Sequence, residues 1–376
     1  MGAVLSAERG DCRFAHWGRA SARVLLAALA VTMVFACLAA PAPPPPQPTV
    51  TPASAPEREP GRPTRDADLR LYDRVVERVR EGDNYYDAAI AEQRVRSFPV
   101  RPGFAVRTPT LARVQASLGR EGTIGASILL LAALAFAWWR RFGDEGARPG
   151  PRRFGTALIV LGASYTLNPY YHVQHELWTG ALIALALGLH RPGRWVPAVM
   201  VAALALAIRE LALPFVLLMG ALALWRRDWK EAAAWATLVL AFAALMAWHF
   251  SIVAGYARPD DAAGPSWLAL RGLSGWVSNV VQSSQLHWLP RWLGGPLVVL
   301  AVLGWAGWRT AAGVATTLLL LGYGAAFMIA GRADNFYWGL MITPVLFAGL
   351  AFLPMSLRGL WRAATVTPSY RATSNE

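Results

Sequence analysis

Charged residues are scarce in this chain of 376 residues: 16% of the residues are charged, whereas 55% are hydrophobic. Soluble domains usually contain about a quarter charged residues. The apolar residues fall into blocks of roughly 13 to 23 residues without a charge, near the length of about 20 that crosses a bilayer. Many of the 17 tryptophans lie at block ends, where indole rings favour the membrane interface. The composition predicts a protein with several membrane-spanning helices.

Cysteine is also scarce, and no CxxC or Cys/His pattern occurs. Cys12 lies in the N-terminal tail and Cys37 lies inside the first apolar block, so the pair does not form a disulfide framework. The centres of the apolar blocks lack Asp, Glu, Lys and Arg as well. Ion channels and proton-coupled carriers commonly place ionisable groups in the middle of the membrane. Their absence argues against these classes.

Acidic residues are outnumbered by basic ones, and the formal net charge is +13. In a soluble protein this charge would suggest nucleic-acid binding, but no basic, aromatic-interleaved soluble domain is visible. The basic residues instead gather in the tails and in short loops between apolar blocks. Short basic loops stay in the cytoplasm. The charge is therefore interpreted mostly as a topology signal, and no nucleic-acid partner is expected.

The sequence predicts an all-α polytopic membrane protein with about ten transmembrane helices and interfacial helices in the first outer loop. Two stretches are divided by a parity argument. Residues 195–225 would form a helix of about 46 Å, too long for a core of roughly 30 Å, and their flanks are both basic. They are predicted to turn at Arg209-Glu210, and 154–189 to turn at "NPYYHVQHEL". The expected spans are 24–40, 122–139, 154–167, 177–189, 195–208, 211–225, 232–254, 296–308, 311–330 and 337–353.

This topology implies a multi-pass protein of the cytoplasmic (inner) membrane with both termini in the cytoplasm. Residues 41–66 are rich in proline and form a semi-rigid linker. The first helix is expected to be retained, and a cleaved signal peptide is the alternative. The predicted parts are the tail and first helix at 1–40, the linker at 41–66, an outer loop at 67–121, a transmembrane domain at 122–356 and a cytoplasmic tail at 357–376.

The outer loop at 67–121 has a helical pattern of its own. Apolar residues at helical spacing in "LRLYDRVVERVR" predict an amphipathic helix over 69–80 that lies on the membrane interface. Asp83 is placed as a plausible N-cap of a second helix. Three prolines hold "FPVRPGFAVRTP" extended. A third short helix follows, with Thr108 as its cap, Pro109 at its first position and Gly119 at its end.

Acids, histidines and arginines collect in the predicted outer turns. The inner turns, in contrast, carry almost only Arg and Lys, without His-Glu or Asp-Asn pairs. Helix turns from separate places can bring these groups to one layer, so a functional site is expected at the outer boundary between membrane and water. The residues are Asp83, Asp87, His172, His175, Glu176, Arg209, Glu210, His287, Arg332, Asp334 and Asn335.

The order of parts over 66–254, with "GDNYYDAAIAEQ" in the first outer loop, resembles the polytopic glycosyltransferases of the GT-C fold. These enzymes use polyprenyl-phosphate-linked sugars and include the aminoarabinose and protein-mannosyl transferases. The resemblance implies a GT-C-like fold. It also implies a periplasmic or extracellular active site that moves a sugar to a cell-envelope glycan, lipid or protein. The chain departs from the family pattern at Asn84, where relatives often have Glu, and in the long linker before the motif.

The resemblance also implies roles for individual residues. The acid of the first outer loop acts as base or orients the acceptor; this role falls on Asp83, with Asp87 in reserve. Some members use a divalent ion, so Mg²⁺ or Mn²⁺ near Glu176 is a candidate cofactor, and no other cofactor is implied. Guanidinium groups suit the departing phosphate, and the candidates are Arg101, Arg107, Arg209 and Arg332. The expected substrate-binding residues are Tyr85, His172, His175, Glu176, Glu210, His287, Asp334 and Asn335.

Each candidate also has a structural explanation. Asp83 can be a helix cap, Arg209-Glu210 a local ion pair, and His172 and His175 interfacial fillers. The alternative functions are a transporter or flippase for lipid-linked glycans and an assembly subunit without chemistry. Transporters often contain internal repeats and broken mid-membrane helices, and the sequence has no convincing repeat.

Overall fold

A computed structural model describes residues 12–39 and 65–365. Most of the predicted linker and the ends of both tails lie outside the described residues. Within them, helices are joined by loops that contain only isolated β-bridges. The α-helices are α2 (Arg19–Leu38), α3 (Ala67–Arg80), α4 (Tyr85–Val95), α5 (Thr110–Asp144), α6 (Pro149–Ala163), α7 (His175–Leu189), α8 (Val196–Ile208), α9 (Leu213–Trp225), α10 (Trp229–Tyr256), α11 (Gly272–Gln282), α12 (Arg291–Gly307), α13 (Ala311–Ile329), α14 (Thr343–Leu346) and α15 (Leu353–Thr365). The 3₁₀ helices are η1 (Arg13–His16), η2 (Gly103–Ala105), η3 (Ser164–Leu167), η4 (Pro169–Tyr171), η5 (Glu210–Ala212), η6 (Gln285–Trp288), η7 (Ala333–Met341) and η8 (Phe347–Ala351).

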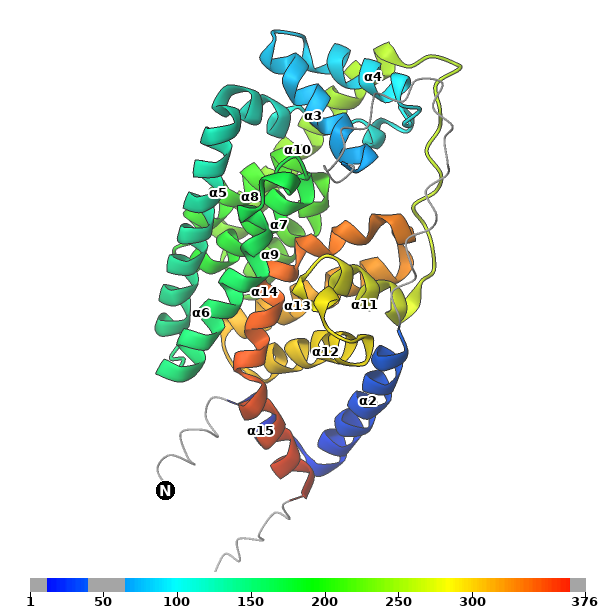
Figure 1. The fold of residues 1–376 in the computed structure, drawn as a ribbon. Helices are drawn as coiled ribbons and strands as arrows, with labels where there is room; N and C mark the ends of the chain where they lie inside the picture. The colour runs from blue at the N-terminus through cyan, green and yellow to red at the C-terminus, as the bar shows by residue number, and fades with distance from the viewer. Residues whose placement is uncertain (1–11, 40–64, 366–376) are drawn as a thin grey trace, which may run out of the picture.

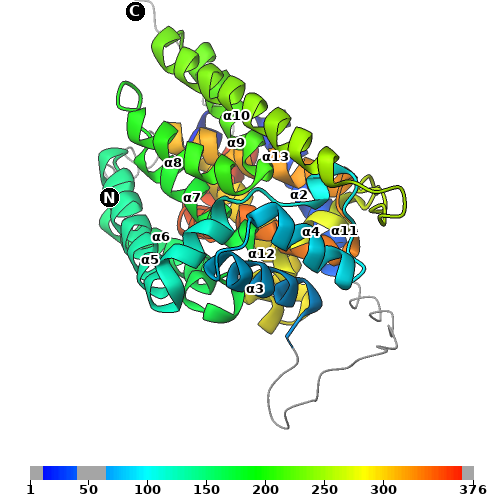
Figure 2. The same cartoon turned by 90° about the horizontal axis from the view of Figure 1, so that it is seen from above.

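The helices form a bundle with α3 and α4 at one end and α2 and α15 at the other (Figure 1). Both ends of the described chain lie at the second end, because η1 and α2 each pack against α15. Seen from above, α3 and α4 lie across the end of the bundle (Figure 2). We call α3, α4, η2 and the start of α5, residues 67–118, the α3–α4 module. The predicted outer loop thus forms a folded unit.

Several helices are long and apolar enough to cross a membrane, but ten spans are not confirmed. Four helices among the described residues meet the length and composition of a span: α2, the helix ending at Asp144, α10 and α13. A fifth span results if the helices over 343–365, bent by 57°, are counted as one. The other apolar helices, α7, α8, α9 with η5, and most of α12, are shorter. The all-α class of the prediction is confirmed for the described residues.

The two predicted turns are confirmed. α8 ends at Ile208, and η5 and α9 follow. Residues 164–174 separate α6 from α7 with two short 3₁₀ helices. Asn and Pro in "NPYY" favour this break, since Asn168 accepts a hydrogen bond from the Tyr170 N–H and Pro169 lacks a donor.

Two predicted caps are wrong. Asn84, and not Asp83, caps α4, because its side chain accepts from the Tyr86 N–H at 2.9 Å. Thr108 does not cap the next helix: its hydroxyl bonds the carbonyls of Ala207 and Ile208 at 2.8 and 3.1 Å. Both corrections follow from tertiary contacts or from a one-residue shift that spacing alone does not resolve.

The predicted span 337–353 is not a straight helix. It consists of the end of η7, α14 and η8. Glycines of neighbouring helices allow its backbone to approach closely, as small residues do between membrane helices. A Cβ at Gly180 in α7 would collide with the Leu340 carbonyl, and one at Gly304 in α12 with the Gly349 carbonyl. The break therefore depends on partners distant in sequence.

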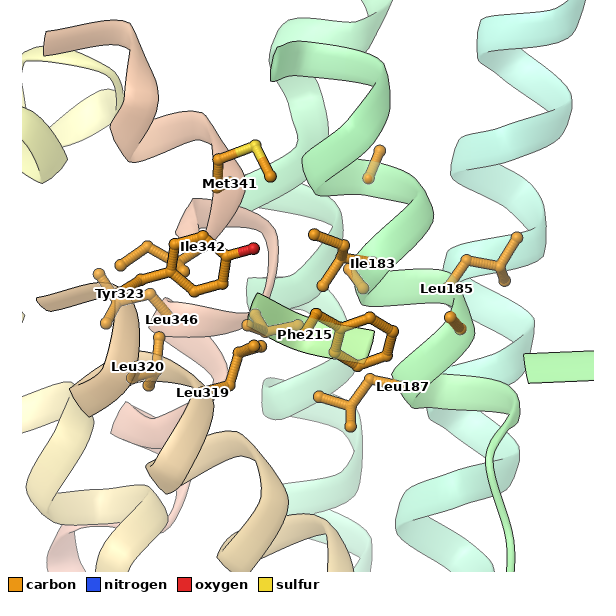
Figure 3. Close-up of a cluster of buried hydrophobic side chains, with 14 of the residues drawn as sticks. Ile183, Leu185, Leu187, Phe215, Leu319, Leu320, Tyr323, Met341, Ile342 and Leu346 are labelled. Carbon is orange, nitrogen blue, oxygen red and sulfur yellow. The ribbon is translucent and has the colours of Figure 1, made fainter. Parts of the chain in front are cut away.

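A continuous apolar core joins the helices of the bundle (Figure 3). Phe215 of α9, Ile183 of α7 and Leu320 of α13 are buried in it. Tyr323 lies in the same core, and its hydroxyl donates to the Leu211 carbonyl at 2.5 Å, next to the turn at Glu210. The core thus fixes the helix ends that carry the polar residues of the α8–α9 turn.

The α3–α4 module has a separate core. Leu71 and Val75 of α3 pack with Tyr86 and Ile90 of α4, and Val253 of α10 joins them. The predicted amphipathic helix is confirmed as a helix, but protein covers its apolar face, which was expected to lie on the membrane interface. This core sets the module firmly on the end of the bundle.

Candidate active site beneath the α3–α4 module

A buried ion pair lies at the centre of the site. The Arg209 Nε atom donates to Glu176 Oε1 at 2.7 Å, and both side chains are at most 3% exposed. Arg209 also pairs with Glu210, and Gln174 donates to Glu176 Oε2 at 2.9 Å. Glu176 lies in the first turn of α7, where the helix dipole favours a carboxylate. Two acids therefore compensate the charge of Arg209.

Arg107 is held beside this pair by four hydrogen bonds that involve residues 106–108. The Tyr85 hydroxyl donates to the Arg107 carbonyl at 2.7 Å. His249 Nε2 lies 3.1 Å from the Val106 carbonyl, and Thr108 is bonded to the carbonyls that end α8, directly before Arg209. The chain at 106–108 is thus tied to α4, α8 and α10.

The Arg107 guanidinium lines a cavity between the module and the bundle. Among the described residues no carboxylate forms an ion pair with it, and Nη1 donates only to the Phe104 carbonyl at 3.3 Å. Its polar neighbours around the cavity are Tyr72, Tyr85, Gln93, Gln115 and His175. The rest of the wall is apolar and comes mainly from α3 and α5: Leu71, Val75, Val76, Leu111 and Ala112. The Glu176 and Glu210 charges act on Arg107 without pairing with it directly. A cation without a direct ion pair in a largely apolar wall is an environment that attracts an anion.

The charges of the site affect the pKa values of two side chains of α3. Burial raises the pKa of Tyr72, and Arg107, Asp68, Glu176 and Arg209 all act on it. Burial likewise raises the pKa of Asp68, against the opposing effect of Arg107. Asp68 is nevertheless exposed to solvent. Asp68 is therefore both accessible to solvent and held with a raised pKa, which suits a carboxylate that accepts a proton.

The structure brings together five of the predicted site residues: Arg107, His175, Glu176, Arg209 and Glu210. A sixth, Tyr85, lines the cavity and bonds the Arg107 carbonyl. These residues come from four separate segments of the chain. The expectation that helix turns gather acid, imidazole and guanidinium groups in one place is met for this subset.

Asp83, Asp87 and Arg101 have partners elsewhere. Asp83 is exposed and pairs with Arg78 at 2.7 Å. Asp87 is exposed on α4, and its carboxylate interacts with the Tyr256 hydroxyl. Arg101 donates to the carbonyls of Pro259 and Asp261 at 3.1 and 2.7 Å, in the loop after α10. The structure gives none of these three a contact with the cavity lining.

The two remaining histidines are also occupied. His172 is buried, and its Nε2 atom lies 2.9 Å from the Thr166 carbonyl. The His172 carbonyl accepts from Gln115 and Trp178, so this residue ties η3, α5 and α7 together. His287 is exposed and lies 3.2 Å from the Tyr165 hydroxyl.

The segment at 332–337 lies near the site on the side of η7. Arg332 forms an exposed pair with Asp334 at 2.9 Å. Asn335 is buried, accepts from the Arg332 N–H and donates to the Tyr337 hydroxyl at 3.2 Å. The Asp334 charge acts on Asp68, and Asp68, Arg107 and Glu176 all act on Tyr337. η7 thus closes the site on the side away from α8.

Three residues of the site were not predicted: Asp68, Tyr72 and Tyr337. Asp68 lies in the first turn of α3 and Tyr72 one turn later, so the two share a helix face. That spacing was visible in the sequence, but nothing there indicated that this face meets Arg107. Tyr337 was recognised only as part of a span end.

The predicted contrast between outer and inner turns is wrong in one respect. At the opposite end of the bundle His190 Nε2 lies 2.8 Å from Glu231 Oε1, and Glu231 also pairs with Arg226 at 2.8 Å. The Trp235 indole donates to the same carboxylate at 3.1 Å. A buried His-Glu pair therefore also exists at the end of the bundle that was predicted to be the inner one. His190 and Glu231 are distant in sequence, so the local pattern of each turn did not reveal it.

A metal site is not formed by the described residues. No three His, Cys, Asp or Glu side chains come close enough together there to hold an ion. Both oxygens of Glu176 already accept hydrogen bonds, from Arg209 and from Gln174. The chemistry below is derived from the side chains alone.

Comparison with known proteins gives no relative from which to transfer a function. No protein family matches the chain, and neither a curated protein nor a solved structure is similar to it.

Proposed function

We propose that the protein is a membrane glycosyltransferase that moves a sugar from a polyprenyl-phosphate donor to a cell-envelope glycan, lipid or protein. The observation that carries the proposal is the cavity beneath the α3–α4 module. It combines a guanidinium without a directly paired carboxylate and mostly apolar walls. Asp68, one turn before the lining residue Tyr72, carries a carboxylate whose pKa is raised by burial and on which Arg107 acts. A lipid phosphate needs a cation for its head and an apolar surface for its tail, and glycosyl transfer also needs a base.

The proposed reaction is a displacement at the anomeric carbon of the donor sugar. The acceptor hydroxyl oxygen forms a bond to this carbon, and the bond from the carbon to the phosphate oxygen breaks with its electron pair. The proton of the hydroxyl passes to the Asp68 carboxylate. Arg107 holds the departing phosphate, and the Arg209–Glu176 pair fixes the floor of the site. Asp68 here replaces Asp83 as the proposed base, because Asp83 is occupied by Arg78 at the surface.

The proposed setting is the cytoplasmic (inner) membrane, with the module on the periplasmic side and both termini in the cytoplasm. In a GT-C-like arrangement the shorter apolar helices α7, α8, α9 and α12 would complete the crossings begun by the longer ones. A cavity at the membrane end of these helices lets a polyprenyl tail remain in lipid while the sugar reaches the acceptor.

The test is mass spectrometry of envelope glycans and lipid-linked sugars from a deletion strain complemented with variants. We expect Asp68→Asn to fold normally and to lower transfer by about 10²-fold or more, since a general base contributes about 10²–10⁴-fold. Glu77→Gln, an exposed acid on the same helix that pairs with Arg74, is the matched control and should restore the sugar. Loss with Asp83→Asn and not with Asp68→Asn would return the role to the residue expected from the sequence.

The alternative function is a transporter or flippase for lipid-linked glycans. The same strains distinguish it. A transporter with Asp68→Asn would still move its substrate, and the deletion strain would accumulate a complete lipid-linked glycan on the cytoplasmic side. A strain that lacks a transferase would instead accumulate the polyprenyl phosphate with its sugar still attached, together with an acceptor without the sugar.

A further inference from the structure

His175 is a polar side chain of the cavity without a partner. It is 4% exposed, and neither Nδ1 nor Nε2 forms a hydrogen bond. The Val173 carbonyl lies close enough to act on the ring, but it is outside hydrogen-bond geometry. Buried polar groups are nearly always bonded, because an unsatisfied one destabilises the fold. Such a group on a cavity wall indicates that a ligand supplies the missing bonds.

The imidazole is held in place by its surroundings. Its ring meets Tyr72 edge to face, with the centroids 5.0 Å apart. It lies at the start of α7, where the Thr179 hydroxyl donates to its carbonyl at 2.9 Å. Glu176, the next residue, is fixed by Arg209. The ring is therefore presented to the cavity by a rigid element and does not need to move to meet a ligand.

The charge state of His175 defines what it can recognise. Its burial and the nearby Arg107 cation both disfavour the charged form of the ring. A neutral imidazole offers one donor and one acceptor. It therefore matches a hydroxyl group, which also donates and accepts, better than it matches a phosphate. Arg107, in the same cavity, matches the phosphate.

We infer that His175 binds a hydroxyl of the donor sugar while Arg107 binds the phosphate to which that sugar is attached. This assigns the cavity to a glycosyl phosphate as one ligand, with its two ends read by two side chains. The inference rests on the proposed function. It adds the residue that distinguishes the lipid phosphate that carries a sugar from the bare lipid phosphate.

The experiment measures binding to the full-length protein in detergent by native mass spectrometry. The probes are a short-chain polyprenyl phosphate and the same lipid carrying mannose, glucose, galactose or arabinose. We expect the wild type to bind at least one glycosylated probe about five-fold more tightly than the bare phosphate, as one hydrogen bond to the ring allows. His175→Phe, which keeps a ring against Tyr72, should lose this preference and bind the bare phosphate unchanged. His175→Gln retains a donor and an acceptor and should keep part of it. Arg107→Gln should weaken binding of both probes.

The outcomes separate the inference from the proposed function. If the wild type prefers a glycosylated probe and His175→Phe retains the same preference, the inference fails and the proposed function stands. If His175→Phe weakens both probes equally, the ring only shapes the cavity and the inference is again wrong. If the wild type binds none of the lipid phosphates, both proposals are overturned. A thermal unfolding curve for each variant shows whether it folds, and His175→Gln carries the test if His175→Phe does not.

Discussion

Arg107 and Arg209 lie in the same site but differ in how their charge is compensated. Arg209 is buried between Glu176 and Glu210, and these two carboxylates neutralise its charge. Arg107 has no acidic partner among the described residues and faces the cavity. A buried ion pair is a structural element whose loss is expensive, whereas an uncompensated cation on a cavity wall is suited to a ligand. The two arginines should therefore respond differently to substitution.

Arg209→Met should destabilise the fold. It leaves Glu176 and Glu210 without their cation, and removing one partner of a buried pair costs about 3–5 kcal/mol. Thermal unfolding in detergent measures the loss. Adding Glu176→Gln removes one of the orphaned charges and should recover part of it. An Arg209→Met protein that unfolds like the wild type would contradict the central position of this pair.

Arg107→Gln should move the pH dependence of transfer. A base acts when deprotonated, so the rate at saturating donor rises with pH through the pKa of Asp68. The Arg107 cation lowers that pKa. Its removal raises the pKa, and the acid limb of the rate profile should shift to higher pH. Arg107→Lys retains the charge and should leave the limb nearly in place. An unmoved limb in Arg107→Gln, or one shifted to lower pH, would exclude Asp68 as the titrating group.

The kinds of side chain in the site were easier to predict from the sequence than the individual residues that form it. Arg107, Glu176 and Arg209 were identified because acids and guanidinium groups at helix turns are unusual in an apolar chain. Asp83 was predicted as the base, with Asp87 in reserve, because both belong to a recognisable local motif that does not include Asp68. Which acid faces Arg107 depends on how α3 is rotated against α5 and η7, and that rotation is set by the core of the module. No local pattern contains this information.

At the scale of elements, Gly119 separates the part of α5 that belongs to the module from the part that crosses the bundle. Its φ of 68° and ψ of −175° interrupt a helix that otherwise runs from Thr110 to Asp144. Only glycine adopts this region readily. Arg107 and the cavity residues Leu111, Ala112 and Gln115 precede the break. The angle at Gly119 therefore positions the wall of the cavity relative to the membrane helices.

Gly119→Ala should cost about 1–3 kcal/mol, because it forces a side chain into this backbone conformation. Gly125→Ala is a matched control one and a half turns further along α5. That glycine is helical with nothing within 4 Å of a new Cβ, and the change should stabilise by roughly 0.5–1 kcal/mol. Unfolding curves of both variants give the comparison. Equal effects at the two positions would mean that the break at Gly119 is not a fixed feature.

Elements were predictable where their signals are local. The turn at Arg209-Glu210, the helix over 69–80 and the break at Gly119 follow from length, amphipathic spacing and glycine, and the structure contains all three. The segment 337–353 has an apolar composition typical of a span and was predicted as one. Its broken backbone lies directly against Gly180 and Gly304 on other helices, where a side chain would collide with it. Composition identifies apolar segments, but contacts between segments decide which of them remain straight.

At the scale of the whole molecule, short basic loops gather at one end of the bundle. The loops at the end opposite the module contain Arg148, Arg191, Arg194 and Arg227. Basic residues in short loops remain in the cytoplasm. The ends of the described chain lie at this same end (Figure 1). α10 links the two ends. The carbonyl of its last residue, Tyr256, accepts a hydrogen bond from Arg94 of the module at 2.7 Å. Its first turn therefore lies at the opposite end. These observations favour a module on the far side of the membrane from the basic loops.

Cysteine labelling tests this orientation directly. In a background with Cys12 and Cys37 replaced by alanine, Glu81→Cys places a thiol at the exposed end of α3 and Lys230→Cys places one in the exposed first turn of α10. A membrane-impermeant maleimide should label Glu81→Cys in cells whose outer envelope has been opened, and it should label Lys230→Cys only after the inner membrane is broken. Labelling in the opposite order would put the cavity in the cytoplasm. A donor in the periplasmic leaflet could not then reach Arg107. The proposed sugar transfer on the periplasmic side would be excluded.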